Sequence, residues 1–271
     1  MSRPLWFVQL IKKIFPGSVL AAGATRVPVL GRILDRWLFE GDDLIYLPKD
    51  RVIQINHSLD LPDETVLPSE VVEYFIEKAN YHWIMNSCLC RDAMQCEDYP
   101  IDLGCLFLGE AVLGINPQLG RPVTKEEALE HVRRCREAGL VHLIGRNKLD
   151  TIWLGVGPGN KLLTVCHCCP CCCLWRVLPY VAPRISAKVT RMPGVTVAVG
   201  DRCVGCGTCT RDVCFVDAIH VVDHRAVIGD ACRGCGRCAS VCPQAAIEIS
   251  IEYGEFVVKA IARISRLVTV S

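Results

Sequence analysis

Two groups of four cysteines with nearly the same spacing follow one another in the C-terminal part of the chain. They are Cys203, Cys206, Cys209 and Cys214, and then Cys232, Cys235, Cys238 and Cys242. In both groups the first three cysteines follow the pattern C-x-G-C-G-x-C. An internal repeat of this kind indicates two similar structural units. Three thiolates at i, i+3 and i+6 wrap one loop around a metal centre, so the repeat predicts two metal centres and a fold built around them.

The second group ends in Cys242-Pro243, and residues 201–251 resemble a bacterial-type ferredoxin with two [4Fe–4S] clusters. The resemblance implies that each half lends its fourth cysteine to the cluster of the other half. The implied ligand sets are Cys203, Cys206, Cys209 and Cys242 for one cluster, and Cys232, Cys235, Cys238 and Cys214 for the other. Because this exchange ties the halves together, we expect the region not to fold without iron.

The alternative for this repeat is a pair of zinc sites, since C-x2-C pairs also bind zinc. The doubled i, i+3, i+6 spacing and the following Cys-Pro favour iron–sulfur clusters. Glycines between the cysteines let the backbone pass close to a cluster and direct amides at its sulfurs; they are Gly205, Gly207, Gly234 and Gly236. Phe215 stands after Cys214 in place of the family's proline, and the spacing before Cys214 is one residue longer. We therefore expect altered local geometry there.

Ten further cysteines form two groups upstream of the repeat. They are Cys88, Cys90, Cys96 and Cys105, and then Cys166, Cys168, Cys169, Cys171, Cys172 and Cys173. So dense a run of free thiols would be reactive if unliganded, and clustering of this kind is typical of metal ligands. We predict that both groups bind iron–sulfur clusters. The segment between residues 86 and 173 also resembles an uncharacterised cysteine-rich module of multi-cluster redox proteins from anaerobes, a resemblance that assigns no ligands.

Spacing leaves the arrangement of these ten thiolates open. They would suit two further [4Fe–4S] clusters with two spare cysteines, or one larger cluster, and a cluster could join the two groups. Cys135 is interpreted as a small buried hydrophobic residue. His167 is interpreted as a hydrogen-bond donor to a cluster sulfur, the alternative being an iron ligand. His82, His131 and His142 lack ligand spacing and are expected to be structural.

The sequence predicts an α+β fold with a cysteine-rich α+β domain (1–190), a pseudo-twofold ferredoxin-like domain (195–252) and an amphipathic C-terminal tail (253–271). Thr124 and Glu127 form a capping box that predicts a helix over 124–138. A helix is also expected from Ser69, and another from Leu5 that Pro16-Gly17 ends. Strands are expected at 42–48 and 51–56, joined by a turn, and at 151–157 and 161–165. Residues 220–222, 226–228 and 247–251 are predicted to be strands too.

Composition excludes several classes of protein. Lys plus Arg number 30 against 29 Asp plus Glu, so we expect no nucleic-acid partner. The longest uncharged stretch, 162–175, is shorter than the roughly 20 residues of a membrane-spanning helix, and Lys12 and Lys13 interrupt the N-terminal apolar segment. We expect a cytoplasmic protein without a transmembrane segment. Its amphipathic terminal helices are expected to pack on their own domain, a membrane surface or a partner subunit.

No P-loop, dinucleotide-binding motif or nucleophile elbow is present. The first hypothesis is therefore an electron-transfer protein that relays single electrons through its clusters to a partner redox protein. The second is a catalytic reductase, because the paired cysteines at 168–169 and 171–172 resemble the Cys-Cys element of heterodisulfide-reductase-type subunits. The third is a cluster carrier or assembly scaffold, suggested by the surplus of thiols.

Overall fold

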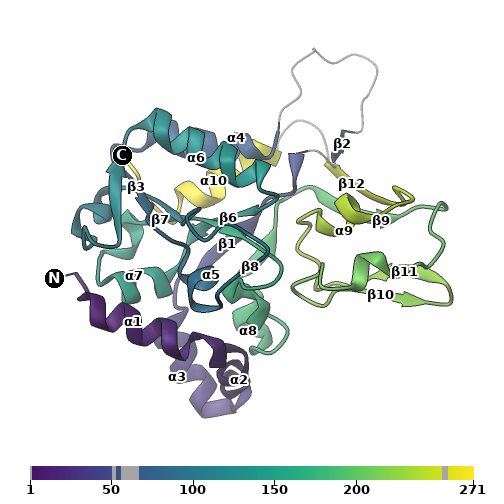
Figure 1. Cartoon of the computed structure of the whole chain (residues 1–271), viewed down its shortest axis with the longest axis horizontal. Coiled ribbons are helices and arrows are strands. Elements are labelled where there is room, and N and C mark those ends of the chain that lie inside the picture. Colours follow the sequence, from purple (N-terminus) through teal and green to yellow (C-terminus); the bar gives the residue numbers. More distant parts are fainter. Residues whose placement is uncertain (1, 51–52, 56–66, 252–255) are drawn as a thin grey trace.

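A seven-stranded sheet in the order β5-β3-β4-β7-β6-β1-β8 forms the centre of the larger part of the molecule (Figure 1). The computed structural model describes residues 2–50, 53–55, 67–251 and 256–271. Neighbouring strands run antiparallel except β1 and β8, which are parallel. The strands are β1 (Asp43–Tyr46), β3 (His82–Met85), β4 (Leu106–Leu108), β5 (Gly120–Val123), β6 (Val141–Arg146), β7 (Leu163–Cys168) and β8 (Val189–Arg191).

Helices cover both faces of this sheet (Figure 1). One face carries α4 (Ser69–Lys78), α6 (Lys125–Glu137) and α10 (Phe256–Ser265). The other carries α1 (Leu5–Ile14), α2 (Ser18–Ala22), α3 (Pro28–Leu38), α5 (Leu89–Ala93), α7 (Lys148–Leu154) and α8 (Pro183–Ser186). Side chains alternate between the two faces along each strand. In β7, Val165 therefore packs in the core beneath α4, α6 and α10, whereas Cys166 and Cys168 face the opposite side.

The smaller part of the molecule contains the cysteine repeat. Strands β9 (Val195–Val199) and β12 (Ile247–Ile251) pair antiparallel, and β10 (Ile219–Val222) and β11 (Arg225–Ile228) form a hairpin. A short 3₁₀ turn, Thr208–Thr210, follows the first cysteine loop, and α9 (Arg237–Val241) follows the second. Strand β2 (Ile53–Ile55), from the N-terminal part of the chain, adds to the sheet in parallel with β12.

The predicted α+β class is confirmed, and so are most of the predicted elements. The α6 capping box is present: Glu127 N donates to Thr124 Oγ1 at 3.2 Å, and Thr124 N donates to Glu127 Oε2 at 2.9 Å. Cys135 is buried in the core, as interpreted. Helix α1 ends at Ile14, but helical turns continue beyond Pro16-Gly17 into α2.

One secondary-structure prediction was wrong. Residues 151–154 belong to helix α7, because the Asn147 side chain accepts a hydrogen bond from Leu149 N and caps that helix. Gly155 ends it in the left-handed conformation, with φ 69°. The strands predicted at 42–48 and 51–56 correspond to β1 and β2, which lie in different sheets. Residues 51, 52 and 56 lie outside the described part of the chain.

The terminal helices have different environments. Helix α10 buries Phe256, Ala260 and Ile264 in the core with α4, and Arg263 Nε donates to Asp43 Oδ2 at 2.9 Å. Its apolar face is therefore covered by its own chain. By length and composition alone, the helical stretch Leu5–Arg26 is apolar enough to cross a membrane, a criterion that core helices and signal sequences also meet.

Candidate metal-cluster sites

The first C-terminal cavity is lined by Cys203, Cys206, Cys209 and Cys242. The first three come from the loop that leads into the Thr208–Thr210 turn, whereas Cys242 ends α9 in the other half of the repeat. Backbone amides already point at two of these sulfurs: Ala226 N donates to Cys203 Sγ at 3.3 Å, and Ala246 N donates to Cys242 Sγ at 3.4 Å. Such amides stabilise negative charge on a thiolate or on a cluster.

The second cavity is lined by Cys232, Cys235, Cys238 and Cys214. Ala218 N donates to Cys214 Sγ at 3.2 Å, which repeats the i+4 amide of the first cavity, and Gly234 N donates to Cys232 Sγ at 3.4 Å. Each cavity therefore combines three cysteines of one loop with one cysteine of the other half. These are the two sets that the ferredoxin resemblance implied.

The glycines of the two loops have the left-handed backbone conformation. Gly205 and Gly234 have φ angles of 66° and 64°. A Cβ at Gly205 would lie 2.4 Å from His224 O, and one at Gly234 would lie 2.9 Å from Val195 Cγ1. A larger side chain would therefore push the Gly205 loop away from the turn between β10 and β11, and the Gly234 loop away from β9. Both halves close around their cavities through the same local conformation.

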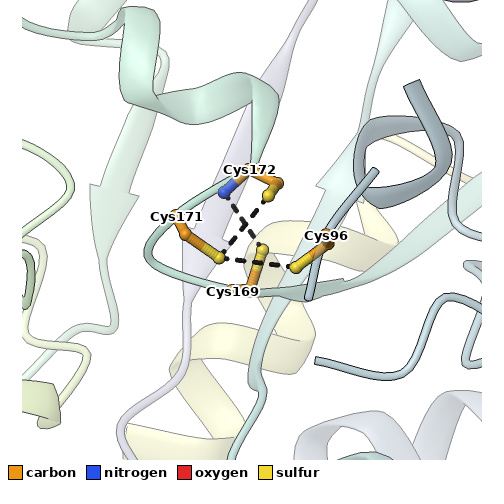
Figure 2. Close-up of side chains that lie close together, drawn as sticks. All are labelled: Cys96, Cys169, Cys171 and Cys172. Carbon is orange, nitrogen blue, oxygen red and sulfur yellow. Dashed lines mark hydrogen bonds between the residues drawn. The ribbon is translucent and has the colours of Figure 1, made fainter. Parts of the chain in front are cut away.

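A tetrad of cysteine sulfurs lies in the N-terminal part (Figure 2). This outer tetrad consists of Cys96, from the loop after α5, and Cys169, Cys171 and Cys172, from the loop after β7. All four sulfurs lie within 4.8 Å of one another. Cys171 Sγ is 3.6 Å from Cys96 Sγ and 3.5 Å from Cys172 Sγ, and Cys172 N donates to Cys169 Sγ at 3.3 Å. Burial raises the pKa of the Cys172 thiol to about 12.

A second set of cysteines lies deeper and forms the inner group: Cys88, Cys90, Cys105 and Cys166. Hydrogen bonds with Cys105 and Cys90 hold the pKa of Cys88 well below its ordinary value. Cys105 Sγ lies 3.8 Å from Cys166 Sγ, because Cys105 directly precedes β4 and this strand pairs with β7 at Leu106 and Val165. The four sulfurs thus make one connected group that lines a cavity of about 350 Å³.

The structure therefore regroups the ten upstream cysteines. Cys96 leaves the first group and joins the run at 169–172, whereas Cys166 leaves the run and joins Cys88, Cys90 and Cys105. Cys168 and Cys173 belong to neither foursome, although both line the inner cavity and they share a hydrogen bond. The sequence had left such mixing open as one of several arrangements.

His167 does not contact the sulfurs of its neighbours, so its interpretation as a hydrogen-bond donor to a cluster sulfur was wrong. It points to the α6 face of the sheet, where its Nδ1 lies 2.9 Å from His142 Nδ1 and its ring packs against His131. His131, Cys135 and His167 place three donor atoms within 4.8 Å of one another. His131 Nε2 is already bonded to Gly104 O at 2.8 Å, and burial lowers the pKa of His142 to about 3. This is a buried, neutral histidine group.

Aromatic and cationic side chains join the second C-terminal cavity to the N-terminal cysteines. Phe215, the residue that departs from the family pattern, is buried against Tyr46 with ring centroids 4.7 Å apart. Tyr46 Oη donates to Cys168 Sγ at 3.6 Å. Arg237, from α9, donates to Cys168 O and lies over the Phe215 ring. One apolar core thus contains cysteines of both parts, which places their cavities next to each other.

Arg237 fits an anionic group in these cavities. It is 4% exposed, its Nε and Nη1 have no hydrogen-bond partner, and it forms no ion pair with a carboxylate of the described residues. A buried guanidinium without a counter-charge is strongly unfavourable. Iron–sulfur clusters held by four thiolates carry the negative charge that this site requires. Arg237 was missed in the sequence because lone arginines carry no motif.

Comparison with known proteins agrees with this chemistry. Residues 210–252 match the family model described as the LdpA Fe-S cluster-binding domain. No curated protein and no solved structure matches the chain. The matched segment includes Cys214 and all four cysteines from Cys232 to Cys242. With the clustered cysteines of the N-terminal part, this match shows that the chain is an iron–sulfur protein.

Proposed function

We propose that this protein transfers single electrons between partner redox proteins through two C-terminal [4Fe–4S] clusters and one or more clusters of the N-terminal part. The observation that carries the proposal is the pair of C-terminal cavities, each lined by four cysteines in the same crossed arrangement. Bound clusters would supply reversible one-electron chemistry. The C-terminal ligands would be the two crossed sets already described.

The chain contributes charge compensation and shielding around these positions. Amides of Ala218 and Ala246 donate to the fourth cysteine of each set, and such donors raise the reduction potential of a cluster. Phe215 and Tyr46 exclude water between the second cavity and Cys168. Arg237 places a positive charge at the same boundary. These contacts favour electron exchange between the two parts of the molecule.

The alternative of a disulfide-cleaving reductase receives less support from the geometry. Of the two cysteine pairs behind this alternative, Cys171 and Cys172 both belong to the outer tetrad, but Cys168 and Cys169 separate, since Cys169 belongs to the tetrad and Cys168 faces Tyr46. A cluster carrier would release iron and sulfide to an apo-ferredoxin. A transfer assay therefore distinguishes it from the electron carrier and from the reductase. We rank the electron carrier first.

The test is anaerobic purification of the full chain, followed by iron and acid-labile sulfide analysis and a redox titration monitored by electron paramagnetic resonance. We expect at least about eight irons per chain and reversible one-electron reduction without loss of iron. Protein with zinc in place of iron, or iron that is not reduced reversibly, would overturn the proposal. Turnover of a disulfide substrate during the titration would favour the reductase instead.

A truncated chain is a poor substitute in this experiment. Removal of everything beyond residue 190 would also remove α10, which is part of the N-terminal core, and the strand β12 that pairs with β2. Single substitutions in the full chain are therefore the cleaner way to assign iron to each site.

A further inference from the structure

Arg91 is a fully buried cation that lies between the inner group and the outer tetrad. Its side chain is 0% exposed, and it donates to three backbone carbonyls: Pro100 O at 2.8 Å, His167 O at 2.7 Å and Leu103 O. Within the described residues it forms no ion pair with a carboxylate. Carbonyl groups accept its hydrogen bonds but do not neutralise its charge, so its site needs a nearby anion.

The nearest candidates for that anion are cysteine sulfurs of both sets. Arg91 lines the same cavity as Cys88, Cys169 and Cys105. Two of these belong to the inner group and one to the outer tetrad. The arginine is therefore placed to balance negative charge on both sides.

The inner cavity has room for more than a single ion. Its volume is about 350 Å³, and beside the sulfurs its walls are mainly apolar and include Ile11, Phe15, Leu38, Trp153 and Trp175. A single tetrahedral ion would fill only a small part of such a space. Apolar walls keep water away from a cluster and thereby set its potential.

We propose that Cys88, Cys90, Cys105 and Cys166 bind their own iron–sulfur cluster, separate from the centre at the outer tetrad, and that Arg91 is the counter-charge shared by both. The inference rests on the proposed function, because it adds a cluster to the same iron–sulfur chain. It assigns two clusters to the N-terminal part and leaves Cys168 and Cys173 as non-ligands at the boundary with Arg237.

The test compares Cys105→Ser, for the inner group, with Cys171→Ser, for the outer tetrad, and with the double variant. Cys135→Ala serves as the control, because Cys135 is a buried cysteine that belongs to neither set. We expect each single variant to lose about four irons per chain, the double variant about eight, and the control none. Spin counting on the reduced proteins should show the loss of a different signal in each single variant.

Two outcomes would overturn the inference. Wild-type iron content in both Cys105→Ser and Cys166→Ser would show that the inner group holds no cluster. Loss of the same irons in both single variants, with no further loss in the double variant, would show one larger shared cluster. Cys166→Ser also replaces Cys105→Ser if the latter does not fold. Failure of the proposed function would look different: wild-type protein with full iron content but no reversible reduction.

Arg91 is tested as a positioning residue through the reduction potentials of the N-terminal signals. In Arg91→Met, loss of the positive charge should lower the potentials of both, because reduction adds negative charge. Arg91→Lys keeps the charge and should shift them less. Unchanged potentials in Arg91→Met, with iron retained, would rule out the role as counter-charge. If Arg91 had only a structural role, both variants would change the stability of the protein, but the reduction potential would not fall further in Arg91→Met than in Arg91→Lys.

A separate observation concerns the outward faces of the N-terminal helices, which lie together along one side of the molecule (Figure 1). Both α1 and α3 carry an apolar stripe with i, i+4, i+8 spacing that points to solvent; the residues are Trp6, Leu10 and Ile14, and Val29, Ile33 and Trp37. Their exposed fractions run from 45% at Ile33 to 72% at Val29. Stripes of this kind are normally buried.

Charge beside these stripes indicates what covers them. Lys13, Arg32 and Arg36 are exposed and form no ion pair within the described residues. Tryptophan together with Lys and Arg on exposed amphipathic helices is typical of helices that lie in the surface of an anionic membrane. We infer that α1 and α3 bind the protein peripherally to an anionic lipid bilayer.

The test is sedimentation of the anaerobic full-length protein with vesicles of phosphatidylcholine, alone or mixed equally with phosphatidylglycerol. We expect binding only to the mixed vesicles, weakened by salt and lost in Trp37→Ser with Arg36→Gln. Leu113→Ser is the matched control, because Leu113 is 63% exposed outside these helices. Absence of binding to mixed vesicles, or equal binding by both variants, would overturn the inference. A stable dimer without lipid, abolished by Trp37→Ser, would identify a protein interface instead.

Discussion

The C-terminal repeat and the inner group of the N-terminal part assemble their cysteine sites in different ways. In the repeat, three of the four cysteines around each cavity follow one another in one short loop. The outer tetrad resembles the repeat, because Cys169, Cys171 and Cys172 share one loop, and only Cys96 is distant in sequence. The inner group instead joins Cys105 to Cys166 from two strands that pair across a long stretch of chain, and it is therefore built by tertiary folding.

The two regions also differ in the cores that stabilise their cysteine sites. The repeat has a small core of its own, in which buried side chains such as Ile219 and Ile247 surround the cysteines. The N-terminal sites lie against larger cores beside the seven-stranded sheet. Cysteine loops with a small core need metal to hold their shape, while cysteines that pack beside the sheet are held by its larger core.

The largest expected effect follows from removal of iron by chelation under reducing conditions. We predict that the repeat loses its structure, whereas the seven-stranded sheet persists, because only the repeat depends on metal for its core. Amide hydrogen exchange followed region by region measures this. Retained protection of β10 and β11 in the iron-free protein would contradict the comparison, and so would complete loss of protection in β6 and β7.

The next effect concerns one ligand of the repeat. Cys238→Ser should remove about four irons and lower the stability of the repeat, while the signals of the N-terminal clusters remain. Iron analysis and the unfolding transition of the variant check this result, with Cys135→Ala as the control for loss of a buried cysteine. An unchanged iron content in Cys238→Ser would refute the crossed ligand assignment.

A smaller effect is expected at the boundary between the two regions. Phe215→Ala removes a buried ring that packs on Tyr46 and should lower the free energy of unfolding by about 3 kcal/mol. Tyr46→Phe, which removes only the hydroxyl that donates to Cys168, should cost about 1 kcal/mol or less. Denaturant unfolding measures both. Equal effects of the two variants would show that the ring contact does not stabilise the boundary.

A further expected effect is a pH dependence that originates in the N-terminal part. Burial raises the pKa of Asp42 from 3.8 to about 7, so the folded protein binds a proton at this carboxyl more readily than the unfolded chain. Its contribution to stability is therefore complete below about pH 4 and is lost as the pH rises through 7. Asp42→Asn should flatten this part of the profile, measured by denaturant unfolding between pH 4 and 8. If the free energy of unfolding of Asp42→Asn changed with pH as steeply as that of the wild type, the result would contradict this prediction.

Much of the fold could be predicted from local patterns. The capping box at Thr124 predicted α6, and alternating apolar residues predicted β12, because caps and alternation act within a few residues. The helix at 148–154 was missed although Asn147 and Gly155 are ordinary cap residues, because the apolar run between them also suits a strand. The placement of β2 beside β12 could not be predicted, since pairing of distant strands has no local signal.

The spacing of the cysteines in the repeat leaves little choice of loop, and the family resemblance implied that the fourth cysteines cross between the halves. The sequence also showed that the upstream cysteines are too dense to be incidental. Only the tertiary structure decided how those ten cysteines divide. The pairing of β4 with β7 places Cys105 beside Cys166, and the loop after β7 returns Cys169, Cys171 and Cys172 to Cys96. Contacts between distant segments are made by the folded sheet, and cysteine spacing does not record them.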